Sequence, residues 1–297
     1  MVLKTLPIDK HHNGVAVKRH AQLFKENRTM RLRFLLCVPV IALAGCQSVQ
    51  TTQGGNVGVD RTQYMMSGLS SEEVNQMAAQ SYDETLAEAK KAGVLNTNAA
   101  TVRRLRKIAD DLTAQATYFR PDAAQWDWEV NLIKDDQLNA SCAPGGKILF
   151  YSGIIDKLNL TDDEIAQIMG HEIAHALREH GREAISRAYA TQMGTQLAGA
   201  LLGLGAGSQQ AAEMAVQYGL TLPNSRSNES EADLIGLELA ARAGYNPDAA
   251  VSLWQKMSSA SQGEPPAFMS THPSSSGRIE ALRAAAPRVE ALYQANK

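Results

Sequence analysis

Two histidines and the glutamate between them form a pattern that suggests a metal centre. They occur in the sequence His-Glu-Ile-Ala-His, whose polar members are His171, Glu172 and His175. Residues four apart on a helix share a face, so both imidazoles can bind one metal ion. Zinc accepts imidazole nitrogen and leaves a position for water, from which Glu172 can take a proton for a leaving amine. The motif therefore predicts one zinc ion (Zn2+) per chain, with Glu172 as the catalytic base.

A further histidine close by is not expected to complete the site. At 100° per residue, His180 lies about 140° round the helix from His175 and points elsewhere, so we expect a structural histidine. The metzincin pattern does not continue either, because Gly181 and not histidine stands ten residues after His171.

A downstream acidic segment offers the missing ligand. In residues 225–233, Glu229 and Asp233 are four apart and share a helix face, whereas Glu231 points away from it. Glu229 can complete a site of two histidines and one glutamate, and Asp233 can orient a liganding imidazole by accepting its other N–H. Without the histidine motif, the same segment would indicate only a solvated acidic helix face.

The elements that must position these residues are mostly helical. Capping boxes open helices at Ser70 and Thr161. Apolar spacing and caps predict helices over residues 70–91, 98–118, 161–190, 226–243, 247–260 and 277–295, with two short helices in 191–220. Strands are expected at 126–133, half-buried with alternating apolar residues, and at 147–151. The expected fold class is therefore α+β, mostly helical, with a small sheet.

The beginning of the chain resembles a bacterial lipoprotein leader. From Met30, two arginines precede an apolar run that ends in Leu-Ala-Gly before Cys46, too short to span a bilayer. We expect residues 1–45 to be a signal peptide, Cys46 to be lipidated, 46–69 to be a flexible tether and 70–297 to be the enzymatic domain. Ser48 after the lipid site favours the outer membrane, with the inner membrane or the soluble periplasm as alternatives.

Charge and cysteine content exclude other classes. Lys and Arg outnumber Asp and Glu by 8 to 2 in residues 1–45, whereas 46–297 carries 21 basic against 29 acidic residues. So acidic a body repels phosphate, and we expect no nucleic-acid partner. Outside the leader and the lipid site only Cys142 remains, so an internal disulfide is excluded. A small buried residue is the better interpretation of Cys142 than a nucleophile.

The motifs together resemble a known family, the periplasmic zinc metallopeptidases of the BepA/LoiP type, which are related to HtpX and the Ste-type CAAX prenyl proteases. The likeness covers most of residues 70–290 and rests on the histidine motif, residues 225–233, Thr271-His272-Pro273-Ser274, Asn139-Ala140 and Gly145-Gly146-Lys147-Ile148. It implies a gluzincin core with His171, His175 and Glu229 on zinc, and Glu172 as base. It also implies that the strand at 147–151 is the sheet edge, facing the metal helix, on which an extended substrate pairs. Membrane-embedded relatives carry transmembrane helices, which are not evident here, so the lipoprotein branch is expected.

His272 has three interpretations. In similar proteins a histidine in the matching segment can approach the zinc and close the site, which would make a self-inhibited resting state. It can instead donate a hydrogen bond to the transition state, or it can be a loop histidine that caps the last helix.

Two function classes follow. The first is a lipid-anchored zinc endopeptidase at the periplasmic face of the outer membrane that cleaves unfolded or misassembled envelope proteins. The second is a chaperone or outer-membrane assembly factor with a closed zinc site. The outer-membrane assembly machinery is a further expected partner. Retention of Glu172 favours the enzyme. A purely structural zinc site fits poorly, because such sites are usually rich in cysteine.

Overall fold

The computed structural model describes residues 45–201, 224–260, 266–273 and 277–297. The chain divides into a first unit, Met1–Cys46, and a second, Gln47–Lys297, which holds the helices and the three-stranded sheet. The mostly helical α+β fold expected from the sequence is confirmed. Within the described residues, no helix combines the length and hydropathy needed to cross a bilayer.

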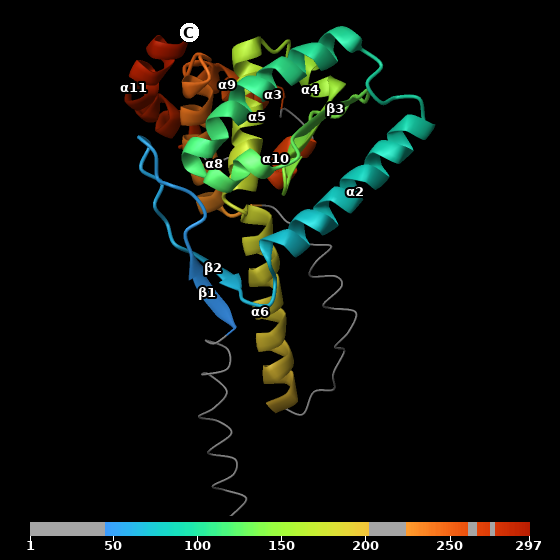
Figure 1. Cartoon of the computed structure of the whole chain (residues 1–297), viewed down its shortest axis with the longest axis vertical. Coiled ribbons are helices and arrows are strands. Elements are labelled where there is room, and N and C mark those ends of the chain that lie inside the picture. The colour runs from blue at the N-terminus through green and yellow to red at the C-terminus, as the bar shows by residue number, and fades with distance from the viewer. Residues whose placement is uncertain (1–44, 202–223, 261–265, 274–276) are drawn as a thin grey trace, which may run out of the picture. The chain divides into compact units, whose positions relative to one another are not determined.

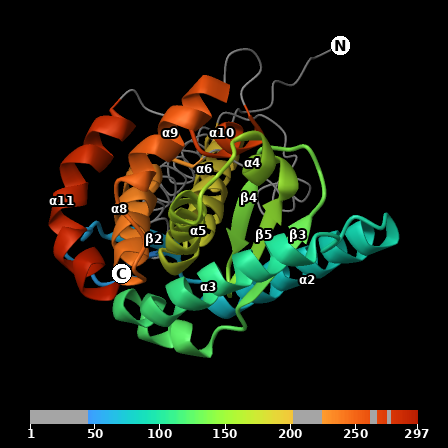
Figure 2. The ribbon, with the colours of Figure 1, turned by 90° about the horizontal axis from the view of Figure 1, so that it is seen from above.

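The metal-motif helix, α5 (Asp162–Leu177), lies at the centre of the second unit. Its start is fixed by a capping box in which Thr161 accepts from the backbone N–H of Glu164, and Glu164 accepts from Thr161. Every residue from Glu164 to Leu177 is buried. Seen from above, α5 runs between α8 (Arg226–Arg242) and the sheet, with α3 (Ala99–Phe119) along the same core (Figure 2). A helix buried on all sides is apolar all round, apart from its functional polar residues.

The crossing of α5 and α8 is unusually close. A Cβ added at Gly236 would lie 2.6 Å from the backbone nitrogen of His171, and one at Gly170 would lie 2.8 Å from the carbonyl oxygen of Gly236. Only glycine at both positions lets the two backbones approach this far. This contact brings Glu229, which lies about two turns before Gly236 on α8, within reach of the histidines on α5.

The three-stranded sheet has the order β3-β5-β4, with β3 (Glu129–Ile133) parallel and β4 (Ala140–Ala143) antiparallel to β5 (Lys147–Tyr151). The expectation that 147–151 is the edge strand is wrong, because β5 is the central strand. The edge that packs against α5 is β4. Its sequence, Ala-Ser-Cys-Ala, is short and lacks the alternation of large apolar and polar residues by which strands are recognised.

Strand β3 also differs from the expected half-buried strand over 126–133. It begins at Glu129, and its last four residues are all buried. One face, with Val130 and Leu132, joins the main core. The other is covered by α2 (Ser71–Lys91), whose Tyr82 packs with Ile133 and hydrogen-bonds the sheet. Because both faces are covered, the strand buries even its polar residue Asn131 and exposes neither face.

The helix expected over 161–190 is two helices. α5 ends at Leu177 and α6 begins at His180 (His180–Leu201), because Glu179 adopts a φ of 50°. Glu179 is held there by Arg120 and Arg182, each 2.7 Å from its carboxylate. The two short helices expected in 191–220 are not seen up to Leu201, where α6 continues; residues 202–223 lie outside the described residues.

The other expected helices are present with shifts of one or two residues at their ends. They are α2, α3, α8, α9 (Ala249–Ala260) and α11 (Arg278–Asn296). Three short helices among the described residues were not predicted: η1 (Pro121–Gln125), α4 (Ser152–Lys157) and α10 (Ala267–Thr271). His272 is the residue that directly follows α10, so this helix determines its position.

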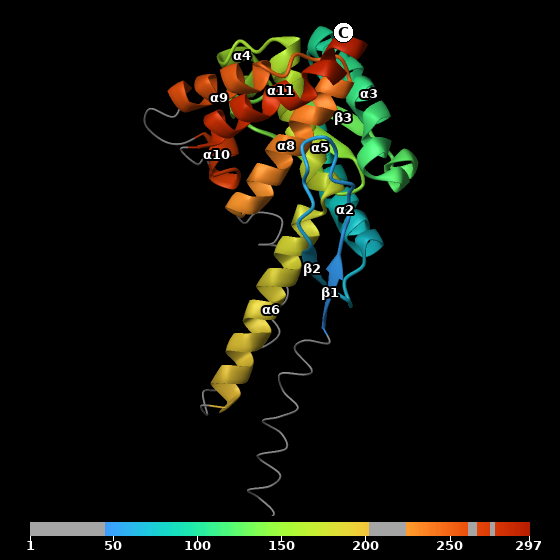
Figure 3. The ribbon, with the colours of Figure 1, turned by 90° about the vertical axis from the view of Figure 1, so that its left-hand side faces the viewer.

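The segment expected to be a flexible tether is ordered against the domain. It contains β1 (Cys46–Val49) and β2 (Gln63–Met66), and β2 lies beside the first turns of α6 (Figures 1 and 3). Val57 is buried, and its N–H donates to Glu238 of α8 at 2.9 Å. Gln63 is fully buried. The segment is held by isolated apolar residues and by polar side chains bonded to buried charges, neither of which produces a periodic pattern.

Replacing Gly236 with alanine should weaken the fold at the α5–α8 crossing. The added methyl must push the two backbones apart, at a cost of about 1–3 kcal/mol. Thermal unfolding would measure this as a lower Tm. Gly68→Ala is the matched control, because a Cβ there meets nothing within 4 Å. An unchanged Tm for Gly236→Ala would contradict the close packing described for this crossing.

Candidate metal centre

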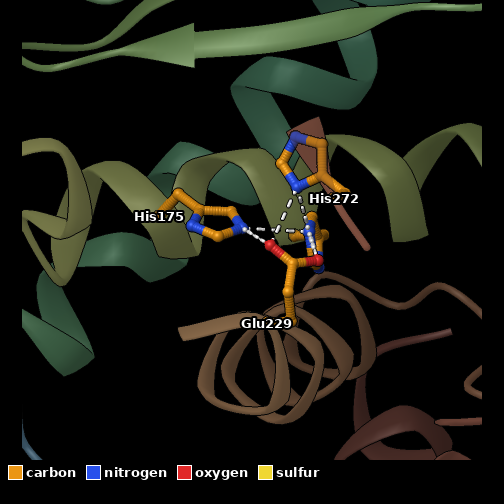
Figure 4. A group of neighbouring side chains, drawn as sticks. His175, Glu229 and His272 are labelled. Carbon is orange, nitrogen blue, oxygen red and sulfur yellow. Dashed lines mark hydrogen bonds and ion pairs between the residues drawn. The ribbon is translucent and has the colours of Figure 1, made fainter. Parts of the chain in front are cut away.

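Four side chains from three elements meet at one point. His171 and His175 project from α5, Glu229 from α8, and His272 follows α10. All four are buried, and one ligand atom from each lies within 4.8 Å of the others. Figure 4 shows His175, Glu229 and His272 pointing toward one another. The structure thus brings together the three ligands expected from the sequence and adds the histidine whose place was open.

The donor atoms of this group fit a zinc ion. The Nε2 atoms of His171 and His175 are 3.0 Å apart, and His272 Nδ1 is 3.2 Å from His171 Nε2. Glu229 Oε1 lies 3.3 Å from His175 Nε2, and its Oε2 lies 2.9 Å from Arg278 Nη1 and 3.6 Å from His171 Nε2. Three imidazole nitrogens and one carboxylate oxygen are ligands that zinc takes in tetrahedral sites.

The carboxylate of Glu229 is an anion in this setting. Burial would raise its pKa, but hydrogen bonds from His175 and His272 outweigh burial and lower the pKa far below the ordinary glutamate value. Burial lowers the pKa of His175, which keeps that imidazole neutral and able to offer a lone pair.

Glu172 lies beside the group without belonging to it. Its Oε1 is buried, lacks a hydrogen bond among the described residues and lies 3.4 Å from His272 Nε2. Burial raises the pKa of Glu172, while His272 and His171 oppose that shift. A carboxylate with a raised pKa, free of strong partners, is suited to accepting and returning a proton.

Asp233 lies where the sequence placed it, behind a liganding histidine. Its Oδ1 is 3.0 Å from Nδ1 of His171, which leaves Nε2 of that ring to face the other donors. Arg278, which sequence reasoning missed, grips Asp233 with Nε at 2.5 Å and Nη2 at 2.6 Å. Its Nη1 is 2.9 Å from Glu229, and the guanidinium stacks on Trp254 at 3.5 Å. A single arginine at the first turn of the last helix carries no sequence signal of such a role.

His180 is not part of the four-residue group, as expected, but it does not point away. Because the helix breaks at Glu179, its Nδ1 lies 2.8 Å from Nδ1 of His175. Its Nε2 lies 3.2 Å from Glu231, which faces away from Glu229. Burial would raise the pKa of Glu231, but the hydrogen bonds from His180 and Arg61 outweigh it and lower the pKa to about 2.

His272 does not cap the last helix, since the N-cap of α11 is Gly277. Its ring is buried and stacks on Phe268 at 4.4 Å between centroids. Burial would lower its pKa, but the carboxylates of Glu172 and Glu229 outweigh burial and raise it. Two interpretations therefore remain, a fourth ligand and a transition-state donor.

A cleft opens beside the group. It has a volume of about 410 Å³ and runs along β4 between α2 and α5, with Glu172, His175 and His272 in its wall. Strand β4 pairs with β5 on one side only, and its residues line the cleft. Cys142 of β4 is buried there, and burial raises the pKa of its thiol, which therefore stays protonated.

Comparison with known proteins matches this geometry to a family. The model of "Peptidase family M48" matches residues 99–286, which include both helices of the metal group and His272. The chain belongs to peptidase family M48. The buried donor group fits the zinc ion of a metalloprotease, and metalloendopeptidases are among the relatives of this chain.

Relatives of this M48 protein include mitochondrial and bacterial proteases. The mitochondrial metalloendopeptidase OMA1 of Schizosaccharomyces pombe is 38% identical over 165 residues, which are 55% of this chain and 48% of that protein. The match thus spans about half of that relative's length. Metalloprotease LoiP of Escherichia coli is 26% identical over 260 residues, covering 86% of this chain and 96% of LoiP. The beta-barrel assembly-enhancing protease of Yersinia pestis is 28% identical over 163 residues, covering 51% and 33%.

Adding zinc to metal-stripped protein should raise its Tm, because an ion that binds only the folded state stabilises it. Glu229→Gln should remove most of that rise, since the neutral amide is a much poorer zinc ligand. Differential scanning calorimetry measures both. Glu280→Gln, an exposed glutamate on α11, is the control and should keep the full rise. Equal zinc-dependent shifts in the two variants would remove Glu229 from the ligand set.

Proposed function

We propose that this M48 protein is an endopeptidase that cleaves extended segments of unfolded or misassembled envelope proteins. His171, His175 and Glu229 hold zinc, and Glu172 is the catalytic base. The observation that carries the proposal is the position of Glu172. One oxygen of its buried carboxylate has no hydrogen bond among the described residues, and the side chain lies beside four converging ligand atoms, in the wall of a cleft bordered by an unpaired strand edge.

The chain's own residues perform most of the reaction. An extended peptide adds to the free edge of β4, which sets its backbone along the cleft. Glu172 accepts the proton that the attacking water loses and passes it to the leaving amine. Asp233, held by Arg278, keeps His171 in the tautomer that presents Nε2. Zinc, when bound, supplies Lewis acidity toward a carbonyl oxygen and activates water at neutral pH.

The envelope as the place of action is supported by two observations. The chain aligns with nearly the whole length of LoiP. It aligns with only about half or less of the OMA1 proteins, although their sequence identity to it is higher. The leader also ends in the lipobox-like sequence before Cys46. We propose that Cys46 is lipidated and anchors the protein to the periplasmic face of the outer membrane; residues 1–44 lie outside the described residues. The assembly machinery of that membrane is a further proposed partner.

A second candidate function has one observation in its favour. His272 Nδ1 lies 3.1 Å from Glu229 and 3.2 Å from His171, the position that a fourth ligand would take in place of water. A site held closed in this way would suit a chaperone or assembly factor that seldom cleaves its clients. The presence of Glu172 favours the peptidase, with the closed form as its resting state.

Glu172→Gln should lose proteolysis while it keeps zinc. Without a base, kcat/KM falls by about 10²–10⁴-fold, which degradation of unfolded casein by the full, zinc-loaded chain would measure. Zinc content by atomic absorption is the control and should equal that of the wild type. If both proteins cleave casein equally, Glu172 is not the base.

His272→Ala should raise kcat several-fold, because the ring would no longer close the site. Peptide hydrolysis under zinc-saturated conditions is the measurement. The matched control is Phe268→Leu, which changes the stacking partner of the ring and leaves its imidazole in place. A large loss of kcat in His272→Ala would instead make His272 a transition-state donor, and an unchanged kcat would contradict both roles.

Cys46→Ser should release the protein from membranes. Expression in a bacterial host with radiolabelled palmitate should label the wild type and not the variant, and density-gradient fractionation should place the wild type with outer-membrane markers. Label in both proteins, or in neither, would contradict lipidation at Cys46. Wild type that travels with inner-membrane markers would contradict the proposed outer-membrane location alone.

A further inference from the structure

A chain of hydrogen bonds connects the metal ligand His175 to the segment that follows Cys46. His175 faces the ligand group with Nε2, and its Nδ1 is 2.8 Å from Nδ1 of His180. The other nitrogen of His180 is 3.2 Å from a carboxylate oxygen of Glu231. Each of the three side chains is at least nine-tenths buried.

The tautomers along this chain follow from one requirement. If Nε2 of His175 offers its lone pair to zinc, its proton is on Nδ1 and is donated to Nδ1 of His180. His180 then carries its own proton on Nε2 and donates it to Glu231. With these tautomers, each N–H of His175 and His180 faces an acceptor and each ring lone pair faces a donor or the metal. Reversing any one bond would place a proton on the nitrogen that faces the metal.

Two arginines fix the carboxylate at the end of the chain. Arg178, fully buried, reaches Glu231 with Nε at 2.9 Å and Nη2 at 2.8 Å. Arg61 pairs with the other oxygen of Glu231 and is itself held by Glu183 at 2.6 and 2.9 Å. A buried carboxylate held by two guanidinium groups has little freedom to rotate.

Arg61 comes from the N-terminal segment, and that segment contacts the network repeatedly. The backbone oxygen of Arg61 accepts from Arg178 at 2.9 Å, and Thr52 Oγ1 lies 3.3 Å from the same guanidinium. Gln63 of β2 donates to the carbonyl oxygen of Arg178 at 2.6 Å and to Glu183 at 3.1 Å. Arg61 therefore contacts Glu231 itself, and Thr52 and Gln63 contact the residues that hold it, Arg178 and Glu183.

We propose that His180 is a positioning residue for the zinc ligand His175, and that Arg61 and Glu231 hold His180 in place. This inference rests on the proposed role of His175 as a ligand. On this view the histidines on α5 have two separate supports. Asp233 and Arg278 orient His171, while His180, Glu231 and the segment after Cys46 orient His175.

Zinc affinity is the first test, measured on the full chain by competition with a chromophoric chelator. His180→Phe keeps the ring volume and removes both hydrogen bonds, so zinc affinity should fall about 10- to 100-fold. His180→Asn keeps an acceptor for His175 and loses the donor to Glu231, so its affinity should be intermediate. An affinity equal to wild type in His180→Phe would overturn the proposal.

The role of the N-terminal segment has its own variant and matched control. Arg61→Gln should weaken zinc binding several-fold, because Glu231 loses one of its two anchors. Arg288→Ala breaks another anchor of the same segment, the 2.7 Å bond from Arg288 to the carbonyl oxygen of Asn56, which does not touch Glu231. It should leave zinc affinity unchanged. Equal zinc affinities in Arg61→Gln and Arg288→Ala would overturn the proposal that Arg61 helps to hold His180 in place.

A spectroscopic readout separates positioning from a general effect on stability. The visible spectrum of the cobalt(II)-loaded protein reports ligand geometry, and it should shift in His180→Phe and Arg61→Gln but not in Arg288→Ala. A variant with a lower Tm and an unchanged cobalt spectrum would make His180 merely structural. Failure of the proposed function is distinguishable, because His175→Ala would then bind zinc as tightly as the wild type.

Discussion

The structure depends on the convergence of three imidazoles and one carboxylate at a buried point. Placing these groups so close is costly, because buried polar atoms need partners and protonated imidazoles repel one another. A divalent cation removes that cost by pairing with all four donors at once. The elements around the point are arranged accordingly. α5 is buried on every side, and two glycines bring α8 close enough for Glu229 to reach the histidines.

Around this point lies a layer of charges that fixes orientation. Asp233 is bound by Arg278 and contacts His171 directly. Glu231 is bound by Arg178 and connects to His175 through His180. Such carboxylates set the tautomer and the rotation of a ligand ring. Glu172 differs from both, since no arginine grips it and one of its oxygens has no hydrogen bond among the described residues. Asp233 and Glu231 thus orient the ligand histidines, whereas Glu172 is the carboxylate that can exchange a proton.

The sequence was sufficient for the features that follow from local periodicity. The spacing of His171 and His175, the capping box at Thr161 and the four-residue step from Glu229 to Asp233 are all helix-surface rules, and the structure places those residues as the rules require. Features that depend on tertiary partners were missed. The break at Glu179 needs Arg120, almost sixty residues earlier, and it alone turns His180 toward His175. β4 has no recognisable pattern, and Arg278 and Arg61 acquire their roles only when distant segments meet.

X-ray absorption at the zinc edge identifies the ligand atoms of the bound ion and their distances. We predict one zinc per chain with three imidazoles and one carboxylate oxygen at about 2.0–2.1 Å in the resting protein. We predict two imidazoles in His272→Ala, with an oxygen replacing the lost nitrogen. Sulfur ligation, or a wild-type spectrum without multiple imidazole scattering, would contradict the assignment of the metal centre to these four side chains.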